Sequence, residues 1–157
     1  MIAILLSLLT ATPVPAGNLQ EQPKGQEKEL KVLARAPWRF GVQDNTQHQL
    51  VIRSQEELEK AAPKQADQLL KALKVDKIDW KTQMLVMVSA GAKRTGGYRV
   101  EITKLTPEGK TLTVHWKLHT PTGFVTQALT HPAESVLVER FDGPVKFDPP
   151  AAKAPEK

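Results

Sequence analysis

The chain has 157 residues, a formal net charge of +5 and no cysteine, with 40% hydrophobic and 25% charged residues. This length suits one domain with tails, and the composition is typical of a soluble globular domain and not of a disordered chain. The absence of cysteine excludes disulfides, thiolate metal sites and cysteine nucleophiles. The positive charge could favour acidic proteins, anionic membranes or nucleic acid, but the basic residues form no long run, which favours an ordinary solvated surface.

The N-terminus is an uncharged apolar run, MIAILLSLLTA, over residues 1–11. It is too short for a bilayer span of about 20 residues, and it has the length of a signal-peptide core. Val14 and Ala16 fit a small-residue cleavage pattern, so we expect a signal peptide over residues 1–16. This predicts an exported protein, periplasmic or extracellular, with no later membrane insertion. A buried N-terminal helix is the alternative, because no Lys or Arg precedes the run.

Two polar or Pro-rich segments flank the expected domain. Residues 17–29 are polar and lack an apolar period, which predicts a disordered linker. Residues 148–157 are rich in Pro and Ala and predict a disordered tail. The folded domain is therefore expected over residues 30–147.

The first part of this domain reads as two extended segments. Residues 30–40 are expected to be extended, with an interruption at Pro37. Residues 41–46 contain Gly, Asp and Asn and predict a turn. Residues 48–53 predict a short strand.

A helical region follows. Ser54 and Glu57 form an S-x-x-E capping box, which predicts that a helix begins here. Pro63 is expected to end this helix or to begin a second one. An apolar stripe at helical spacing then continues through Leu69, Leu70 and Leu73 and predicts a surface that packs on the core.

The central segments alternate or are wholly apolar, as strands are. Residues 84–88 (MLVMV) predict a strand covered on both faces at the centre of the sheet. Residues 98–105 and 111–119 alternate between apolar and polar side chains and predict an antiparallel hairpin. The sequence TPEG at 106–109 predicts a type I turn between them.

Three more strands are expected at the C-terminal end, over residues 124–129, 135–141 and 145–147. Asp142–Gly143 is a turn signal, and Pro144 favours an edge position for the last strand. The predicted fold class is therefore α+β, with one or two helices packed on a mainly antiparallel sheet that could curl into a partial barrel.

The Gly-rich segment 91–97 (GAKRTGG) has the spacing of a phosphate-binding loop but not its chemistry. Gly97 stands where that loop needs Lys, and an alternating strand follows where it needs a helix. The segment is therefore expected to be a turn. As an alternative, Lys93, Arg94 and the Gly96–Gly97 backbone could grip a carboxylate or peptide chain of a partner.

His115 and His119 resemble a zinc-binding H-x-x-x-H pair. On a strand, however, four residues separate their backbones by about 13 Å, and a single zinc ion with bonds of about 2 Å cannot bridge that distance. We therefore expect no metal site here.

No other pattern in the chain points to catalysis or nucleic-acid binding. No G-x-S-x-G motif and no carboxylate pair stands out, so we expect no enzymatic activity and no cofactor. Trp116 and Tyr98 fall in register with apolar residues and belong to the core face of their strands. An exposed aromatic platform for nucleic acid is therefore not expected.

An ordered set of short motifs between residues 77 and 147 carries a family resemblance. A G-x-K-x-T-G-G-Y motif opens a strand and is followed by a T-P motif and then a T-x-A-x-T-x-P motif. The residues are Gly91, Lys93, Thr95, Gly96, Gly97, Tyr98, Thr120, Pro121, Thr126, Ala128, Thr130 and Pro132. This set resembles the C-terminal domain of the PrcB family, whose founding members are accessory subunits of cell-surface protease complexes.

The resemblance implies an exported, non-enzymatic domain that binds a protein partner, with an exported protease as the candidate, and that assists the assembly or stability of a protease complex. The candidate partner-binding residues are Lys93, Arg94, Thr95, Gly96, Gly97, Tyr98, Thr120, Pro121, Thr130 and Pro132. Alternatively, these residues only shape turns. The alternative functions are a small-ligand-binding or hydrolytic domain and a structural envelope protein. No cysteine follows the apolar run, so a lipid anchor is not expected.

Overall fold

The computed structural model describes residues 28–37 and 45–149. The predicted signal peptide lies outside these residues, as do most of the predicted linker, most of the predicted turn at 41–46 and nearly all of the predicted tail. Within the described part of the chain, no helix combines the length and the apolar character that a membrane crossing requires.

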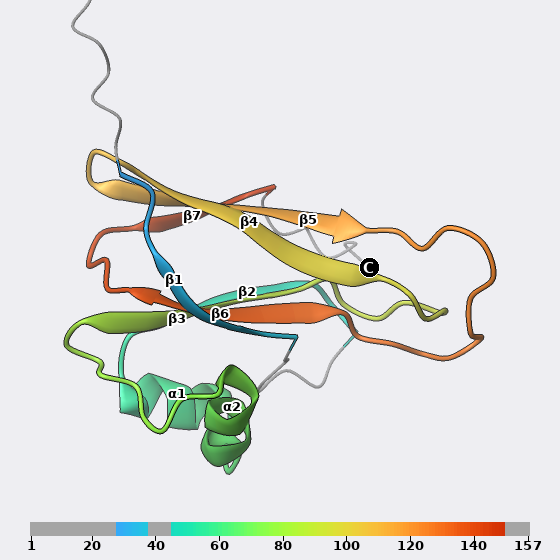
Figure 1. The fold of residues 1–157 in the computed structure, drawn as a ribbon, viewed down its shortest axis with the longest axis horizontal. Helices are drawn as coiled ribbons and strands as arrows, with labels where there is room; N and C mark the ends of the chain where they lie inside the picture. Colours follow the sequence, from blue (N-terminus) through green and yellow to red (C-terminus); the bar gives the residue numbers. More distant parts are fainter. Residues whose placement is uncertain (1–27, 38–44, 150–157) are drawn as a thin grey trace, which may run out of the picture.

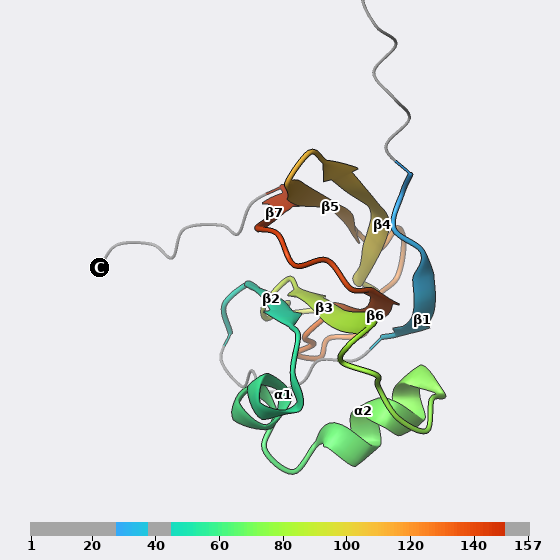
Figure 2. The ribbon, with the colours of Figure 1, turned by 90° about the vertical axis from the view of Figure 1, so that its left-hand side faces the viewer.

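Seven strands and two helices form three layers (Figures 1 and 2). The middle layer is a four-stranded antiparallel sheet in the order β1-β6-β3-β2, and a three-stranded sheet in the order β4-β5-β7 covers one of its faces. The helices cover the other face. The elements are β1 (Val32–Ala36), β2 (His48–Ile52), α1 (Gln55–Ala61), α2 (Ala66–Leu73), β3 (Gln83–Ser89), β4 (Arg99–Glu108), β5 (Thr111–His119), β6 (Ala133–Glu139) and β7 (Val145–Asp148).

The predicted α+β class is confirmed, but the predicted curling into a partial barrel is wrong. No ladder among the described residues joins the two sheets. At one side only single hydrogen bonds bridge them, such as the 2.9 Å bond from the Leu30 N–H to the Leu105 carbonyl. At the other side, the Arg53 guanidinium donates to the carbonyls of Phe141 and Gly143. Side chains thus fill the gap that a barrel would close with strand pairing.

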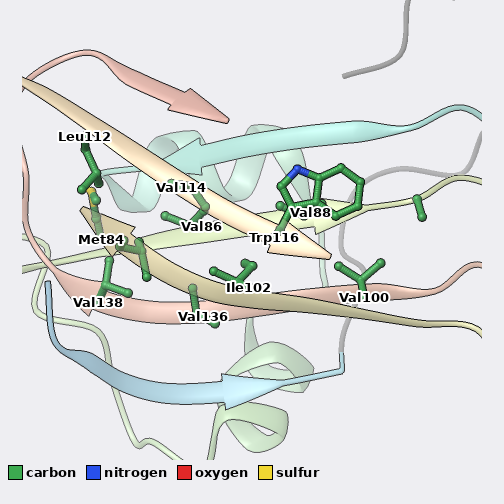
Figure 3. Packing of buried hydrophobic residues seen from close by; sticks show 12 residues of the cluster. Met84, Val86, Val88, Val100, Ile102, Leu112, Val114, Trp116, Val136 and Val138 are labelled. Atoms are coloured by element: carbon green, nitrogen blue, oxygen red, sulfur yellow. The ribbon is translucent and has the colours of Figure 1, made fainter. Parts of the chain in front are cut away.

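The predicted central strand is confirmed as β3, which lies between β6 and β2. Its residues from Met84 to Ser89 are all buried, because both faces of the sheet are covered. Met84, Val86 and Val88 pack toward the three-stranded sheet, as Figure 3 shows. Leu85 and Met87 pack toward the helices. This two-sided burial explains the continuous apolar run.

The predicted capping of the first helix is confirmed. Ser54 Oγ accepts a hydrogen bond from the Glu57 N–H at 3.1 Å. The Glu57 carboxylate in turn accepts from the Arg53 N–H at 2.6 Å, one residue before the position that a standard capping box uses. Of the two predicted roles of Pro63, the structure supports the helix end, since α1 ends at Ala61 and α2 begins only at Ala66. Leu58, Leu69 and Leu73 are buried against the four-stranded sheet.

The predicted hairpin is confirmed as β4 and β5, but the predicted type I turn at 106–109 is wrong. Thr106 and Pro107 continue the ladder opposite Thr113 and Leu112, and the chain turns at Gly109, whose φ is +60°. The longer ladder adds cross-strand pairs, and it tolerates Pro107 because no strand of the described chain lies on the other side of β4.

A bulge in β4 explains which of its side chains are buried. The register shifts between Ile102 and Lys104. Val100, Ile102 and Leu105 can therefore all face the core, which a regular period of two would not allow.

The C-terminal strand predictions had mixed outcomes. The strands expected at 135–141 and 145–147 are confirmed as β6 and β7, and β7 lies at a sheet edge as Pro144 indicated. Within the described chain β7 pairs only with β5, and this pairing is parallel. The strand expected at 124–129 is wrong, since this segment has no regular strand pairing in the structure.

Candidate functional site

Two loops continue the β3–β6 ladder irregularly beyond the end of the sheet. We call residues 90–98 and 120–132 together the loop pair; Figure 1 shows them side by side where they project beyond the end of β5. Single hydrogen bonds replace the regular ladder. They run from Ala90 N to Pro132 O (3.0 Å), between Lys93 and Thr130 in both directions (2.7 and 2.9 Å), and from Gly96 N to Thr126 O (2.9 Å). The loop pair is therefore anchored directly to the two central strands.

The small and hydroxyl-bearing motif residues hold the two loops in close contact. A Cβ atom on Gly96 would lie 2.3 Å from the Thr126 hydroxyl oxygen. Gly97 has a φ of +85°, and a Cβ atom there would lie 2.7 Å from the Pro121 Cβ. The Thr130 hydroxyl donates to the Thr95 carbonyl at 2.8 Å. The spacing between the loops therefore requires glycine at both positions.

A third segment packs against the base of the loop pair. Gly91 has a φ of +70°, and a Cβ atom there would lie 2.6 Å from the Asn45 carbonyl oxygen. The same carbonyl accepts a hydrogen bond from the Ala92 N–H at 3.0 Å. The Asn45 side chain lies 3.2 Å from His131 Nε2. After Gly97 the chain passes into β4, as predicted, and not into a helix. The segment therefore lacks the helix N-terminus that a phosphate-binding loop requires.

The structure brings all ten predicted partner-binding residues together in the loop pair, but they differ in what they expose. Five of them lie where the two loops touch each other or where the loops meet the end of β3. These are Thr95, Gly96, Pro121, Thr130 and Pro132.

The other five predicted residues lie nearer the surface. Arg94, Gly97 and Thr120 are exposed. Tyr98 is half-buried, with the Lys93 ammonium 6.0 Å from the centre of its ring, at the limit of a cation–π contact.

Sequence reasoning missed the most exposed apolar side chains of the loop pair. Phe124 has a relative exposure of 110%, and Leu129 has 63%. Both lie in the segment for which a strand was predicted. The neighbouring Gly123 was the available sequence signal for a turn, and in the structure its φ is +90°.

The loop pair contains basic side chains but no acidic ones. Neither loop contains Asp or Glu. Within the described residues, neither Lys93 nor Arg94 forms an ion pair with a carboxylate. The loop pair therefore presents positive charge beside exposed apolar side chains.

The two histidines of β5 contact different carboxylates. His115 Nδ1 is 3.3 Å from an Asp148 oxygen, and His119 Nε2 is 2.5 Å from a Glu101 oxygen. The hydrogen bond from His119 is the main cause that lowers the pKa of the Glu101 carboxyl below its ordinary value. Across residues 28–37 and 45–149, no group of three or more His, Cys, Asp or Glu side chains is placed to hold a metal ion.

A surface hollow lies beside the helices, away from the loop pair. Its lining residues are Gln55, Glu59, Pro63, Lys64, Ala66 and Asp67. This lining contains neither Ser nor His, so it lacks the side chains that a serine hydrolase site would bring together.

The central part of the fold is similar to a known family. Residues 84–139 match the family model described as PrcB C-terminal. The predicted resemblance is confirmed. The matched segment contains β3 except for its first residue, all of β4, β5 and β6, and the whole loop pair, whereas β1, β2, both helices and β7 lie outside it. No curated protein and no solved structure matches the chain.

Proposed function

We propose that this protein is an exported, non-enzymatic interaction domain that binds a partner protein through the loop pair. The observation that carries this proposal is the combination of a firmly held scaffold with exposed apolar and cationic side chains at its end. In this proposal the chain acts as an accessory part of a protease complex, and the partner is an exported protease.

The rigidity of the loop pair supports a binding role. Hydrogen bonds between the two loops, which continue directly from β3 and into β6, together with close packing at Gly96 and Gly97, hold both loops in place before any partner arrives. A surface that is already ordered loses less conformational entropy on binding, so more of the contact energy appears as affinity.

The exposed side chains are of the kinds that dominate protein interfaces. Phe124 and Arg94 belong to residue types that are enriched in the energetic centres of interfaces. Leu129 adds apolar area on the same loop as Phe124. Such side chains cost little to expose singly, but together on an anchored loop pair they favour a binding surface.

The match to the PrcB C-terminal family supports the link to a protease complex. The apolar run of residues 1–11, with its small-residue cleavage pattern, supports export. An exported partner would then meet this domain in the same compartment.

Site-specific photocrosslinking in the native producer tests the proposal. A photoreactive side chain replaces Arg94, and a matched control replaces Lys60, which is exposed on α1 in the helical layer. We expect position 94 to yield one dominant adduct with an exported protease and position 60 to yield none. Equal adducts at both positions, or no adduct at position 94 in correctly folded protein, would contradict the proposal.

A further inference from the structure

We propose that residues 124–129 form an acceptor edge, to which an extended acidic segment of the partner protein adds as a β-strand. This inference rests on the proposed function and specifies how the partner is held. It assigns the binding contacts to main-chain atoms of the loop pair as well as to its side chains.

The first observation is a strand-like segment without a strand on its outer side. The sequence FVTQAL has the composition of a strand, and the segment leads by way of Thr130 toward β6. Within the described chain, the only main-chain group of residues 124–129 with a hydrogen-bond partner is the Thr126 carbonyl. No other N–H or C=O group of this segment is paired within the described chain, so the groups that face outward can pair with another chain.

The hydrogen-bonded groups show which main-chain atoms face outward. The Thr126 carbonyl and both main-chain groups of Thr130 point toward residues 93–96. In an extended chain, the N–H and C=O of successive residues point to opposite sides. The main-chain groups of Val125, Gln127 and Leu129 therefore point away from residues 93–96, toward the open side.

The second observation is that this edge lacks the protection found on β4. There, the Arg35 guanidinium donates to the Ile102 carbonyl at 2.8 Å, and the Glu134 carboxylate accepts from the Ile102 N–H. Proteins commonly block sheet edges with charged side chains or proline to prevent pairing with other chains. Residues 124–129 contain neither. An edge without such protection is the kind of edge to which a peptide of another protein adds as a strand.

The positive charge of the loop pair favours an acidic partner strand. Lys93 and Arg94 have no carboxylate partner within the described residues, and neither loop contains an acidic residue. An incoming strand with Asp or Glu would supply the missing partners, and its apolar residues would cover Phe124 and Leu129. A second copy of the chain fits less well, because two positively charged loop pairs would repel each other.

Selection of short linear peptides from a phage-displayed random library on the immobilised full chain tests this inference. We expect the enriched peptides to combine Asp or Glu with β-branched or aromatic residues. The affinity of one such peptide is then measured by fluorescence anisotropy for the wild type and two variants. Gln127→Pro removes an outward main-chain N–H, whereas Gln127→Ala keeps it.

We expect Gln127→Pro to weaken peptide binding by about tenfold or more and Gln127→Ala to change it by less than about twofold. Methylation of the peptide amides should reduce binding at every second position, because only alternate amides of a strand face its neighbour. Retained hydrogen-exchange protection of the Gly96 and Thr130 amides establishes that the loop pair of each variant is intact.

Four results would overturn the inference. They are enriched peptides without acidic residues, equal affinity of the two variants, methylation effects without alternation, and a dimer of the chain that only Gln127→Pro dissociates. The last result would make a second copy the occupant. If the photocrosslink from position 94 to a protease survives Gln127→Pro, the proposed function stands and strand addition falls. If neither crosslink nor peptide enrichment occurs, both fall.

Discussion

Replacement of Gly97 by alanine tests whether close packing holds the loop pair together. Gly97 has a φ of +85°, in the left-handed region that residues with a Cβ atom disfavour. The added methyl group would also lie 2.7 Å from the Cβ of Pro121, and the proline ring cannot rotate away as a flexible side chain could. Gly97→Ala should therefore force the two loops apart.

The expected loss of stability follows from two costs. The left-handed conformation costs an L-residue about 1–2 kcal/mol. The steric conflict with Pro121 adds about 1–3 kcal/mol, as overpacking of a well-filled site does. Gly109 provides the matched control, because its φ is +60° but a Cβ atom there would meet no atom within 4 Å. Gly109→Ala should therefore incur the backbone cost alone.

Urea denaturation followed by circular dichroism measures the free energy of unfolding of both variants, and hydrogen exchange at the Gly96 and Thr130 amides reports on the loop pair itself. We expect Gly97→Ala to lose at least about 1 kcal/mol more than Gly109→Ala, the lower bound of the steric cost, and to exchange faster at both amides. Equal losses and unchanged exchange would refute the view that contact with Pro121 holds the loops together.

Three further predictions concern the rest of the fold. Ser54→Ala should lower the free energy of unfolding by about 1 kcal/mol, measured by urea denaturation, because the Glu57 N–H loses its acceptor; an unchanged midpoint would contradict the capping role. Arg140→Ala should cost about 2–3 kcal/mol in the same assay, since its guanidinium donates to two backbone carbonyls, and Arg140→Lys should recover only part of the loss. His119→Ala should raise the pKa of the Glu101 carboxyl, measured by NMR titration, because the main cause of its lowering is removed. A carboxyl whose pKa is lowered by folding stabilises the protein above its unfolded-state pKa and loses this effect as the pH falls through its folded-state pKa. The stability difference between wild type and His119→Ala that arises from Glu101 should therefore shrink under acidic conditions, and a difference that grows there would contradict the assignment.

The packing of the loop pair shows what its motif residues do. The motif contains small and hydroxyl residues that could either bind a partner or shape turns. In the structure, Gly96, Gly97 and Thr130 pack the two loops against each other. They support the surface, while Arg94 and Phe124 are the groups that a partner can reach.

Much of the fold followed from short-range patterns. The alternation in residues 111–119 predicted one buried face, and Leu112, Val114 and Trp116 are buried as expected. The turn at 106–109 was wrong because a local preference of Thr106 and Pro107 was outweighed by pairing with β5. Cross-strand contacts of this kind depend on a partner segment that a local pattern does not reveal.

The strand predicted at 124–129 failed for a related reason. Its residues have the composition of a strand, but strand structure requires a neighbour to complete the hydrogen bonds. Along this segment the only such bond within the described chain is the one from Gly96 to Thr126. The lack of a neighbouring strand along residues 124–129 in the described part of the chain is also the observation on which the strand-addition proposal depends.

The amino-acid order alone determined the class of fold, the capped helix, the central apolar strand and the positions of the unusual glycines, because each depends on neighbours a few residues away. Only the tertiary structure decided that the strands divide into two sheets, that Gly97 meets Pro121, and that Phe124 projects outward beside unpaired positive charge. Such contacts join residues far apart in the chain, and their geometry depends on how the layers pack.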